Sequence, residues 1–366
     1  MTERQLVLED GTIFSGEGFG ADTETSGEIV FHTGMTGYQE MLSDPSYCGQ
    51  IIIQTYPLAG NYGINRDDFE AVTPFVRGFI AKECCRFPSN ARSEETLHDY
   101  LQTNNIPGIA GIDTRKLTKH VRTYGTMRAV IIDASKNPEQ ALETLRNTSP
   151  QTGLVQQTSA LKPYVVPGAG MRIVLVDFGM KHGIMRELLK RECHVTVVPY
   201  NYSAESILRL KPDGILLSNG PGNPKDIPDS MEMVRSLLGS YPVFGIGLGH
   251  QLLALACGAN TEKMLFGHRG PSHPVKDLEK SKIVMTSQNH GYIVSHQSLR
   301  GTELELTQVS VHDSSVEGIR HAVYPAFSVQ YQPESAPGSE DTKDLYDEFL
   351  QLITDWNANN KEDIYA

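Results

Sequence analysis

Short apolar runs separated by glycine and polar residues dominate the first 60 positions of the chain. They are rich in branched and aromatic residues and are bounded by turn formers, a pattern that predicts β-strands. These runs lie at residues 5–8, 12–14, 28–31 and 51–53. Helical periodicity follows at 93–104 and 113–124. Asp113 or Thr114 is placed to cap the second helix, so we expect a β-rich, mixed N-terminal domain over residues 1–150.

From residue 171 onward, continuous apolar runs alternate with helical stretches. The apolar runs lie at 173–176, 195–199, 214–217, 243–246 and 327–330, and the helical stretches at 183–191, 203–210 and 249–256. Strands that are continuously apolar, without alternating polar residues, and that are separated by helices are typical of a parallel sheet covered on both faces. We therefore predict an α/β domain with a central, mainly parallel sheet over residues 171–360. We expect its catalytic or ligand-binding residues at the carboxyl ends of the strands.

The length of 366 residues fits about two domains. Between residues 147 and 170 the pattern degrades into Thr, Ser, Gln, Pro and Gly. Such a composition is typical of a connection between domains. We place the interdomain linker at 151–170.

The charge balance argues against some partners. The chain has 32 basic and 44 acidic residues, a net charge of −12, and no stretch concentrates Lys or Arg. A nucleic acid or an anionic membrane surface is therefore not an expected partner. No apolar run approaches the ~18 residues of a membrane span, and the first residues do not form a secretory signal. We expect a cytoplasmic protein.

The turn at 218–224 directly follows the predicted strand at 214–217. Gly220 and Gly222 lack a Cβ, so backbone N–H groups can face inward and hold an anion or a developing oxyanion. The alternative is a tight surface turn without a chemical role.

The sequence Gly-Ile-Gly-Leu-Gly at 245–249 leads from a predicted strand into a helix. This is the spacing of a nucleophile elbow, in which the central residue presents its side chain from a strained turn. The central residue is Gly247, which has no thiol, hydroxyl or amine to attack a substrate. A dinucleotide-binding motif is disfavoured because its third glycine would fall at His250.

The turn at 329–335 again closes a strand. A polar residue followed by Pro-Glu could orient a catalytic base, with Glu334 as the third member of a triad. The polar residue is Gln332, an amide that holds a hydrogen bond but does not accept a proton near neutrality.

Histidines and cysteines give no metal-ligand spacing. The segment 289–292, Asn-His-Gly-Tyr, suits either a polar ligand or a loop held by its neighbours. His268 and His273 lie five residues apart with Pro271 between them, which favours a structural loop. The five cysteines are odd in number and contain no C-x-x-C pair, so we expect reduced thiols and no metal site.

Four motifs of the C-terminal half resemble class I glutamine amidotransferase domains. They are Gly-Ile-Gly-Leu-Gly-His-Gln at 245–251, Ser-Asn-Gly-Pro-Gly-Asn-Pro at 218–224, Ser-Gln-Asn-His-Gly at 287–291 and Val-Gln-Tyr-Gln-Pro-Glu at 329–334. The N-terminal half is similar to the small chain of carbamoyl-phosphate synthase through the segments 35–40, 44–47 and 111–117. The resemblance covers almost the whole chain.

This resemblance implies that residues 1–150 dock on a large synthetase subunit, which alone would use ATP and metal. The C-terminal domain of the family hydrolyses glutamine and sends ammonia to that partner, which makes carbamoyl phosphate for pyrimidine or arginine biosynthesis. The nucleophile of the family is a cysteine and its base a histidine. Their positions are occupied here by Gly247 and Gln332, so that Glu334 is the remaining triad member. Asn223 also replaces the aspartate that is usual in the family.

The resemblance also implies a glutamine pocket whose contacting positions are retained, with L-glutamine as a candidate ligand. These positions are Ser46, Gly220, Gly222, Leu248, Gln251, Asn289, Gly291 and Tyr292.

Three hypotheses follow. The first is a pseudoenzyme: a structural or regulatory small subunit without glutamine hydrolysis, whose synthetase partner uses free ammonia. The second is a working glutaminase that recruits another group, such as His290 or a thiol. The third is a glutamine sensor that couples the occupied pocket to the activity of the partner.

Overall fold

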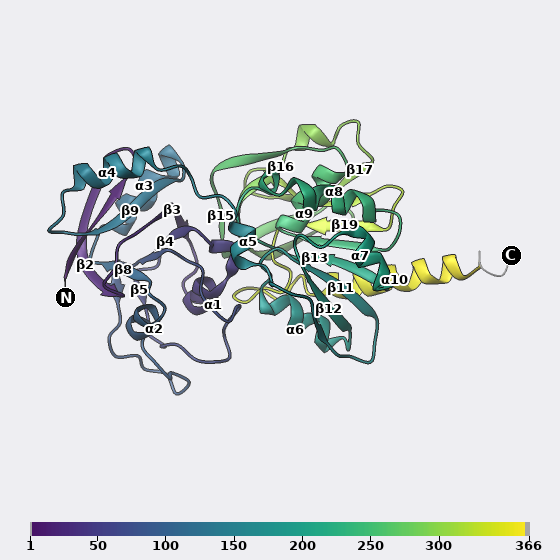
Figure 1. Ribbon diagram of the computed structural model, residues 1–366, viewed down its shortest axis with the longest axis horizontal. Coiled ribbons are helices and arrows are strands. Elements are labelled where there is room, and N and C mark those ends of the chain that lie inside the picture. Colours follow the sequence, from purple (N-terminus) through teal and green to yellow (C-terminus); the bar gives the residue numbers. More distant parts are fainter. Residues whose placement is uncertain (1, 363–366) are drawn as a thin grey trace. The chain divides into compact units, whose positions relative to one another are not determined.

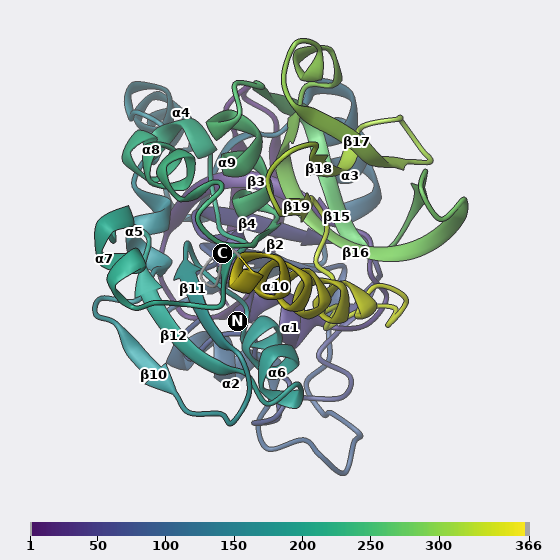
Figure 2. The same cartoon turned by 90° about the vertical axis from the view of Figure 1, so that its right-hand side faces the viewer.

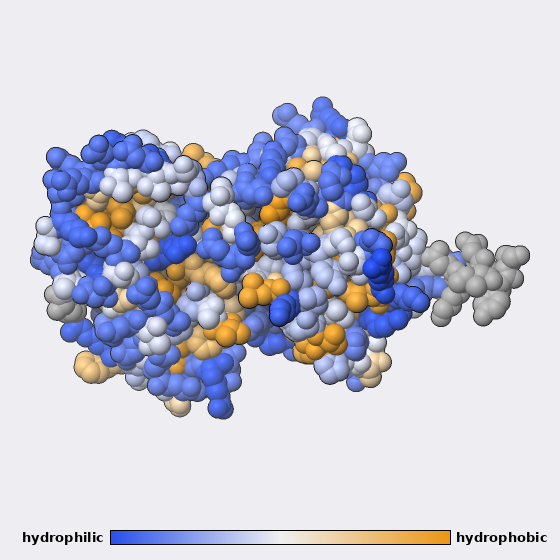
Figure 3. All heavy atoms as spheres, in the orientation of Figure 1, coloured by the Kyte–Doolittle hydropathy of each residue, from blue (hydrophilic) through white to orange (hydrophobic). Residues whose placement is uncertain are grey.

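A computed structural model describes residues 2–362 of the chain. The described residues divide into two compact units, with the boundary between residues 154 and 155, and the units are described separately below (Figure 1). All five cysteines lie in the described part, and none of them forms a disulfide there. No helix within residues 2–362 is long and apolar enough to cross a membrane. Figure 3 shows apolar side chains as separate small patches on a largely hydrophilic face.

The first unit is built on a closed β-barrel. In barrel order, its described strands are β1 (Glu3–Leu8), β2 (Ile13–Gly20), β8 (Pro107–Ala110), β6 (Gly78–Ile80), β4 (Gln50–Gln54), β3 (Thr25–His32) and β9 (Met127–Asp133). The barrel closes because β9 pairs antiparallel with β1, where Leu6 lies opposite Ile131. Its core includes Val30, Ile52 and Phe79, all fully buried. The predicted β-rich, mixed domain is confirmed.

Short elements complete this unit. They are α1 (Tyr38–Ser43), η1 (Pro45–Tyr47), β5 (Leu58–Ala59), β7 (Glu83–Cys84), α2 (Leu97–Thr103), α3 (Thr114–Tyr124) and α4 (Pro138–Asn147). The expected cap of α3 is confirmed, because the Asp113 side chain accepts a hydrogen bond from the Lys116 N–H. α2 begins later than its periodicity suggests, since Thr96 caps it.

The second unit contains a ten-stranded sheet within its described residues. In sheet order, the strands are β10 (Tyr164–Val166), β12 (His194–Pro199), β11 (Arg172–Asp177), β13 (Gly214–Leu217), β14 (Val243–Ile246), β19 (Ala326–Val329), β18 (Val316–His321), β17 (Leu304–Ser310), β15 (Thr261–Asp277) and β16 (Lys282–Val294). The strands from β12 to β19 are parallel, as expected for the centre, and antiparallel strands extend the sheet at both edges.

Helices cover both faces of the parallel strands (Figure 2). The helices and short turns of this unit are α5 (Leu154–Thr158), α6 (His182–Lys190), α7 (Ala204–Arg209), η2 (Pro224–Asp226), α8 (Pro228–Leu237), α9 (Leu248–Ala256), η3 (His296–Leu299) and α10 (Asp344–Glu362). α6 and α10 share one apolar core with the sheet through Leu188 and Phe349. On the other face, α7, α8 and α9 share a second core through Ile207, Val234 and Leu252. Both faces of each central strand are therefore buried, which explains the unalternating apolar runs.

Two segments differ from the expectations. The segment 151–170, expected to be a linker, carries α5 and the strand β10, which pairs with β12. Residues 266–273, expected to form a structural loop, lie within β15. Register shifts interrupt the pairing of β15 with β16 in this region, so its sequence lacks the regular alternation of a strand.

Candidate functional site

Three turns follow three neighbouring parallel strands, β13, β14 and β19. Parallel strands place their carboxyl ends at one edge of the sheet, so the turns at 218–224, 247 and 330–335 meet there. A Cβ built on Gly247 would lie 3.4 Å from Asn219 Cβ and 3.7 Å from the Gln330 carbonyl oxygen. The structure thus brings together the three turns that the sequence singled out.

The backbone at Gly247 has the strained geometry of an elbow. Its φ and ψ are 56° and −106°, outside the regions that most residues adopt. The Gly247 N–H donates to the Val329 carbonyl, and the Gly247 carbonyl accepts from the Gln251 N–H as α9 begins. These bonds fix the turn between strand and helix. The space beside Gly247 accommodates a Cβ at ordinary contact distances, so the position could carry a side chain.

The flanking glycines have no such space. A Cβ on Gly249 would lie 2.3 Å from the Leu217 carbonyl oxygen, and one on Gly245 would lie 2.9 Å from the Gly249 carbonyl. Close packing of helix on strand therefore requires glycine at both flanks. Of the three glycines, only Gly247 is free of this constraint.

The end of β19 holds a buried cluster around a lysine. The Lys181 ammonium lies 3.1 Å from Glu334 Oε1 and donates to Gln332 Oε1 at 3.2 Å. It also donates to the carbonyls of Ser335 and Ala336, at 2.6 and 2.9 Å. Lys181, Gln332 and Glu334 are all buried. The Lys181 ammonium is therefore neutralised by the Glu334 carboxylate and also donates hydrogen bonds, as a buried charge requires.

Sequence reasoning missed Lys181. It lies in the turn after β11, the neighbour of β13, and its own N–H donates to Asn219 Oδ1 at 3.1 Å. The rule that found the other turns, that chemistry gathers after parallel strands, also applies to this one.

Seven of the eight positions that the resemblance implies for glutamine lie in the second unit, and Ser46 lies in the first. Gly220 packs against Phe178 and Leu248, since a Cβ there would lie 2.4 Å from the Phe178 carbonyl oxygen and 2.9 Å from Leu248 Cδ2. The Gln251 side-chain amide donates to the Tyr292 carbonyl and to Gln330 Oε1, each at 2.9 Å. These bonds join α9 to β16 and to the end of β19.

The remaining positions are placed as follows. Gly222 has a φ of 86°, which favours glycine in its turn. Asn289 and Gly291 lie in β16, and a Cβ on Gly291 would lie 3.1 Å from Arg269 Nη2. Ser46 lies in η1 of the first unit, buried, with its N–H donating to Asp44 Oδ1 at 2.8 Å.

Two buried histidines, His250 and His290, lie near these turns. The His250 ring lies 2.9 Å from the Ser328 hydroxyl, and burial lowers the pKa of His250 to about 3. The two nitrogens of His290 lie 2.9 Å from the Tyr292 carbonyl and 2.8 Å from Gln288 Oε1. Burial and the neighbouring His268 hold the pKa of His290 well below its usual value. Both rings are therefore uncharged near neutrality.

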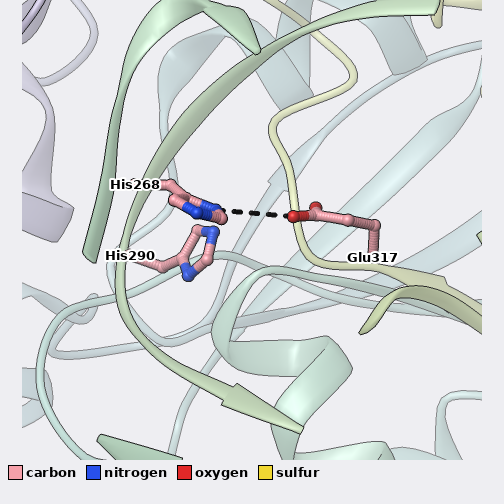
Figure 4. Close-up of side chains that lie close together, drawn as sticks. All are labelled: His268, His290 and Glu317. Atoms are coloured by element: carbon pink, nitrogen blue, oxygen red, sulfur yellow. Dashed lines mark ion pairs between the residues drawn. The ribbon is translucent and has the colours of Figure 1, made fainter. Parts of the chain in front are cut away.

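A second polar cluster lies in the antiparallel part of the sheet. His268, His290 and Glu317 each offer one atom, and these atoms lie within 4.8 Å of one another (Figure 4). Burial opposes a charge on His268, but the carboxylates of Asp313 and Glu317 outweigh it and raise the pKa of His268 to about 9. Imidazole and carboxylate groups in this arrangement could hold a metal ion.

Comparison with known proteins places this fold in a family. Residues 6–131 match the model of the carbamoyl-phosphate synthase small chain, CPSase domain, and residues 174–352 match that of class I glutamine amidotransferases. The carbamoyl phosphate synthase small chain of Oceanobacillus iheyensis is 63% identical over 366 residues, the full length of both chains. The chain belongs to the carbamoyl phosphate synthase small-chain family.

Two other members of this family are similarly close. The small chain from Bacillus caldolyticus is 60% identical over 359 residues, covering 98% of this chain and 99% of the relative. The pyrimidine-specific small chain of Bacillus subtilis is 59% identical over 351 residues, covering 96% of each. The resemblance stated from the sequence, and the α/β fold that it implied for the amidotransferase domain, are confirmed.

Proposed function

We propose that this chain is a carbamoyl phosphate synthase small subunit that does not hydrolyse glutamine and acts with a large subunit that uses free ammonia. The observation that carries the proposal is Gly247, which stands at the centre of an elbow and offers no attacking atom. Amide hydrolysis by this route needs a nucleophile that forms a covalent intermediate. Loss of the nucleophile in a comparable triad costs on the order of 10⁶ in kcat, or about 8 kcal/mol.

The surroundings of Gln332 support the same proposal. Its amide oxygen accepts a hydrogen bond from Lys181, and an amide does not take up a proton near neutrality. Glu334, the expected orienting carboxylate, is paired with the same lysine. In this arrangement the carboxylate neutralises a buried ammonium rather than orienting a base.

The alternative of a working glutaminase with a recruited group has less support. Each nitrogen of His290 lies within 3 Å of an oxygen, the Tyr292 carbonyl at 2.9 Å or Gln288 Oε1 at 2.8 Å. Burial raises the pKa of Cys48, Cys193 and Cys257 to about 11, so these thiols are protonated near neutrality. Oxyanion donors alone would retain ~10³–10⁴ over the uncatalysed reaction, which is too slow to feed a synthetase.

The retained positions around the elbow favour a glutamine-binding or regulatory role. Gly220, Leu248 and Gln251 are held by contacts that do not depend on a residue 247 side chain. A pocket of this kind could bind L-glutamine and leave it intact. The partner is proposed to be the large subunit, because the curated relatives are small chains, and the complex would supply cytoplasmic pyrimidine or arginine biosynthesis.

The test is the double reversion Gly247→Cys with Gln332→His, assayed for glutamate release beside the unmodified chain, each with a large subunit. We expect no release above background from the unmodified chain and a gain on the order of 10⁶ in kcat from the double variant. The matched control is Gly258→Cys with Gln332→His. Gly258 also has a positive φ, 89°, with open space around it, so this variant adds a thiol outside the elbow.

Two results would contradict the proposal. Glutamate release by the unmodified chain at an ordinary enzymatic rate would show that another group replaces the cysteine. Equal recovery in the Gly258→Cys control would show that the elbow is not what positions the thiol.

A further inference from the structure

The cluster of His268, His290 and Glu317 lies in the antiparallel strands β15, β16 and β18, outside the elbow site. The side chains come from three strands and point toward one another (Figure 4). Only 6%, 8% and 0% of their surfaces remain exposed. Buried ionisable groups of this kind need either matched charges and hydrogen bonds or a bound cation.

Each of the three side chains is oriented by a partner on its other side. His268 Nε2 lies 3.0 Å from Asp313 Oδ2, and His290 Nδ1 lies 2.9 Å from the Tyr292 carbonyl. Glu317 Oε2 accepts a hydrogen bond from the Gln288 amide at 2.9 Å. Carboxylates and carbonyls that hold the far nitrogen of a histidine are the usual supports of metal-binding histidines.

The near nitrogen of His268 has no hydrogen-bond partner within residues 2–362. This atom, Nδ1, is buried and lies 3.6 Å from Glu317 Oε1. That spacing is too long for a hydrogen bond. It is close to the separation of about 3.3 Å that two tetrahedral ligands take around zinc at bond lengths of ~2.0 Å.

His290 also has more acceptors around it than it can donate to. A neutral imidazole carries one N–H, yet its two nitrogens face the Tyr292 carbonyl and Gln288 Oε1. One nitrogen therefore meets another acceptor. If the oxygen and nitrogen of the Gln288 amide were exchanged, Oε1 would face the Glu317 carboxylate, and two acceptors would again lie against each other.

The cluster thus contains acceptor atoms that lack a donor, and one additional positive charge, either a proton or a metal ion, would satisfy them. We propose that it is a site for a divalent transition metal of the zinc class, bound by His268 Nδ1, His290 Nε2 and a Glu317 carboxylate oxygen. Gln288 Oε1, which lies 2.8 Å from His290 Nε2, is placed to be the fourth ligand. The ion would be neutralised by the carboxylates of Glu317 and Asp313. Asp313 keeps 42% of its side chain exposed and marks the side from which an ion can enter.

This proposal does not rest on the loss of glutamine hydrolysis, and it differs from the expectation that the chain holds no metal. The sequence drew attention to His268 and His273, which lie on the same strand. The structure instead places His268 opposite His290 across the β15–β16 pair and adds Glu317 from β18. The pairing across strands is what creates the set of ligands.

The experiment uses the unmodified full-length chain, stripped with a chelator and then titrated with Co²⁺ and with Zn²⁺. We expect one equivalent of bound metal per chain by elemental analysis after gel filtration. We also expect the visible absorption of tetrahedral Co²⁺ and a rise in the thermal midpoint with Zn²⁺. His268→Gln and Glu317→Gln should lose all three signals. His296→Gln, which changes an exposed histidine outside the cluster, should keep them.

The unmodified chain decides the outcome even if the cluster variants do not fold. No bound metal and no thermal shift in the folded, unmodified chain would show that a buried proton fills the position, and would overturn the proposal. Equal metal content in Glu317→Gln and in the unmodified chain would place the metal elsewhere and would overturn it as well.

Discussion

The elbow turn and the histidine cluster are two buried regions of the same sheet that differ in what they contain. One has the backbone geometry of a functional site, and the other has a group of closely spaced ionisable side chains. The elbow keeps the backbone, with Gly247 strained at φ 56° and flanked by glycines that packing requires, but it lacks a reactive side chain. The cluster keeps the side chains, with His268, His290 and Glu317 each supported by a partner. The backbone shape of an elbow therefore does not depend on a reactive side chain, because the packing of helix on strand maintains it.

The largest effect in the elbow region should come from Lys181→Met. Removal of the ammonium leaves the Glu334 carboxylate buried beside Gln332 without its cation, which costs about 3–5 kcal/mol of unfolding free energy. Urea denaturation measures the loss. The double variant Lys181→Met with Glu334→Gln should recover part of it, because no uncompensated charge remains. No recovery in the double variant would contradict the ion-pair account.

The next effect separates the two kinds of elbow glycine. Gly249→Ala should cost about 3 kcal/mol, because its Cβ would lie 2.3 Å from the Leu217 carbonyl oxygen. Gly247→Ala should cost about 1 kcal/mol, since only backbone strain opposes a Cβ that has room. Equal losses in urea denaturation would show that position 247 is no more open to a side chain than its neighbour.

A smaller effect contrasts two buried imidazoles. His250 faces a hydroxyl and is held neutral, with a pKa of about 3, whereas His268 faces two carboxylates and has a pKa of about 9. The unfolded chain binds a proton at His250 near pH 6.5 and the folded chain does not. The contribution of His250 to the free energy of unfolding therefore falls as the pH drops below 6.5, by about 2 kcal/mol at pH 5.

His250→Gln should remove this part of the acid sensitivity while keeping a hydrogen bond to Ser328. The measurement is the urea midpoint of the variant and the unmodified chain at pH 7 and pH 5. His296→Gln, on the surface, is the control and should leave the difference between the two pH values unchanged. An unaltered pH dependence in His250→Gln would contradict the assignment of a neutral buried ring.

Much of the elbow region could be predicted from sequence because its determinants are local. The strand–glycine–helix pattern at 243–256 fixes the turn within a few residues, and the parallel sheet places the neighbouring turns beside it. The same reasoning identified Gln332 and Glu334. It did not identify Lys181, whose ammonium donates to Gln332 and Ser335, more than 150 residues away in the chain.

The histidine cluster could not be predicted in this way. It depends on the register between β15 and β16 and on Glu317 from β18, and irregular pairing of β15 breaks the alternation that marks a strand. The closure of the N-terminal barrel has the same origin, since β1 pairs with β9 more than 120 residues later. Contacts between distant strands leave little trace in local sequence patterns.

The most direct test of the central claim is mass spectrometry of the unmodified chain after incubation with L-glutamine or an electrophilic glutamine analogue. Without an attacking atom at position 247, the intact mass should stay unchanged and no peptide should carry an acyl group. The double variant Gly247→Cys with Gln332→His should be labelled at residue 247. A covalent adduct on any residue of the unmodified chain, formed at a catalytic rate, would contradict the account.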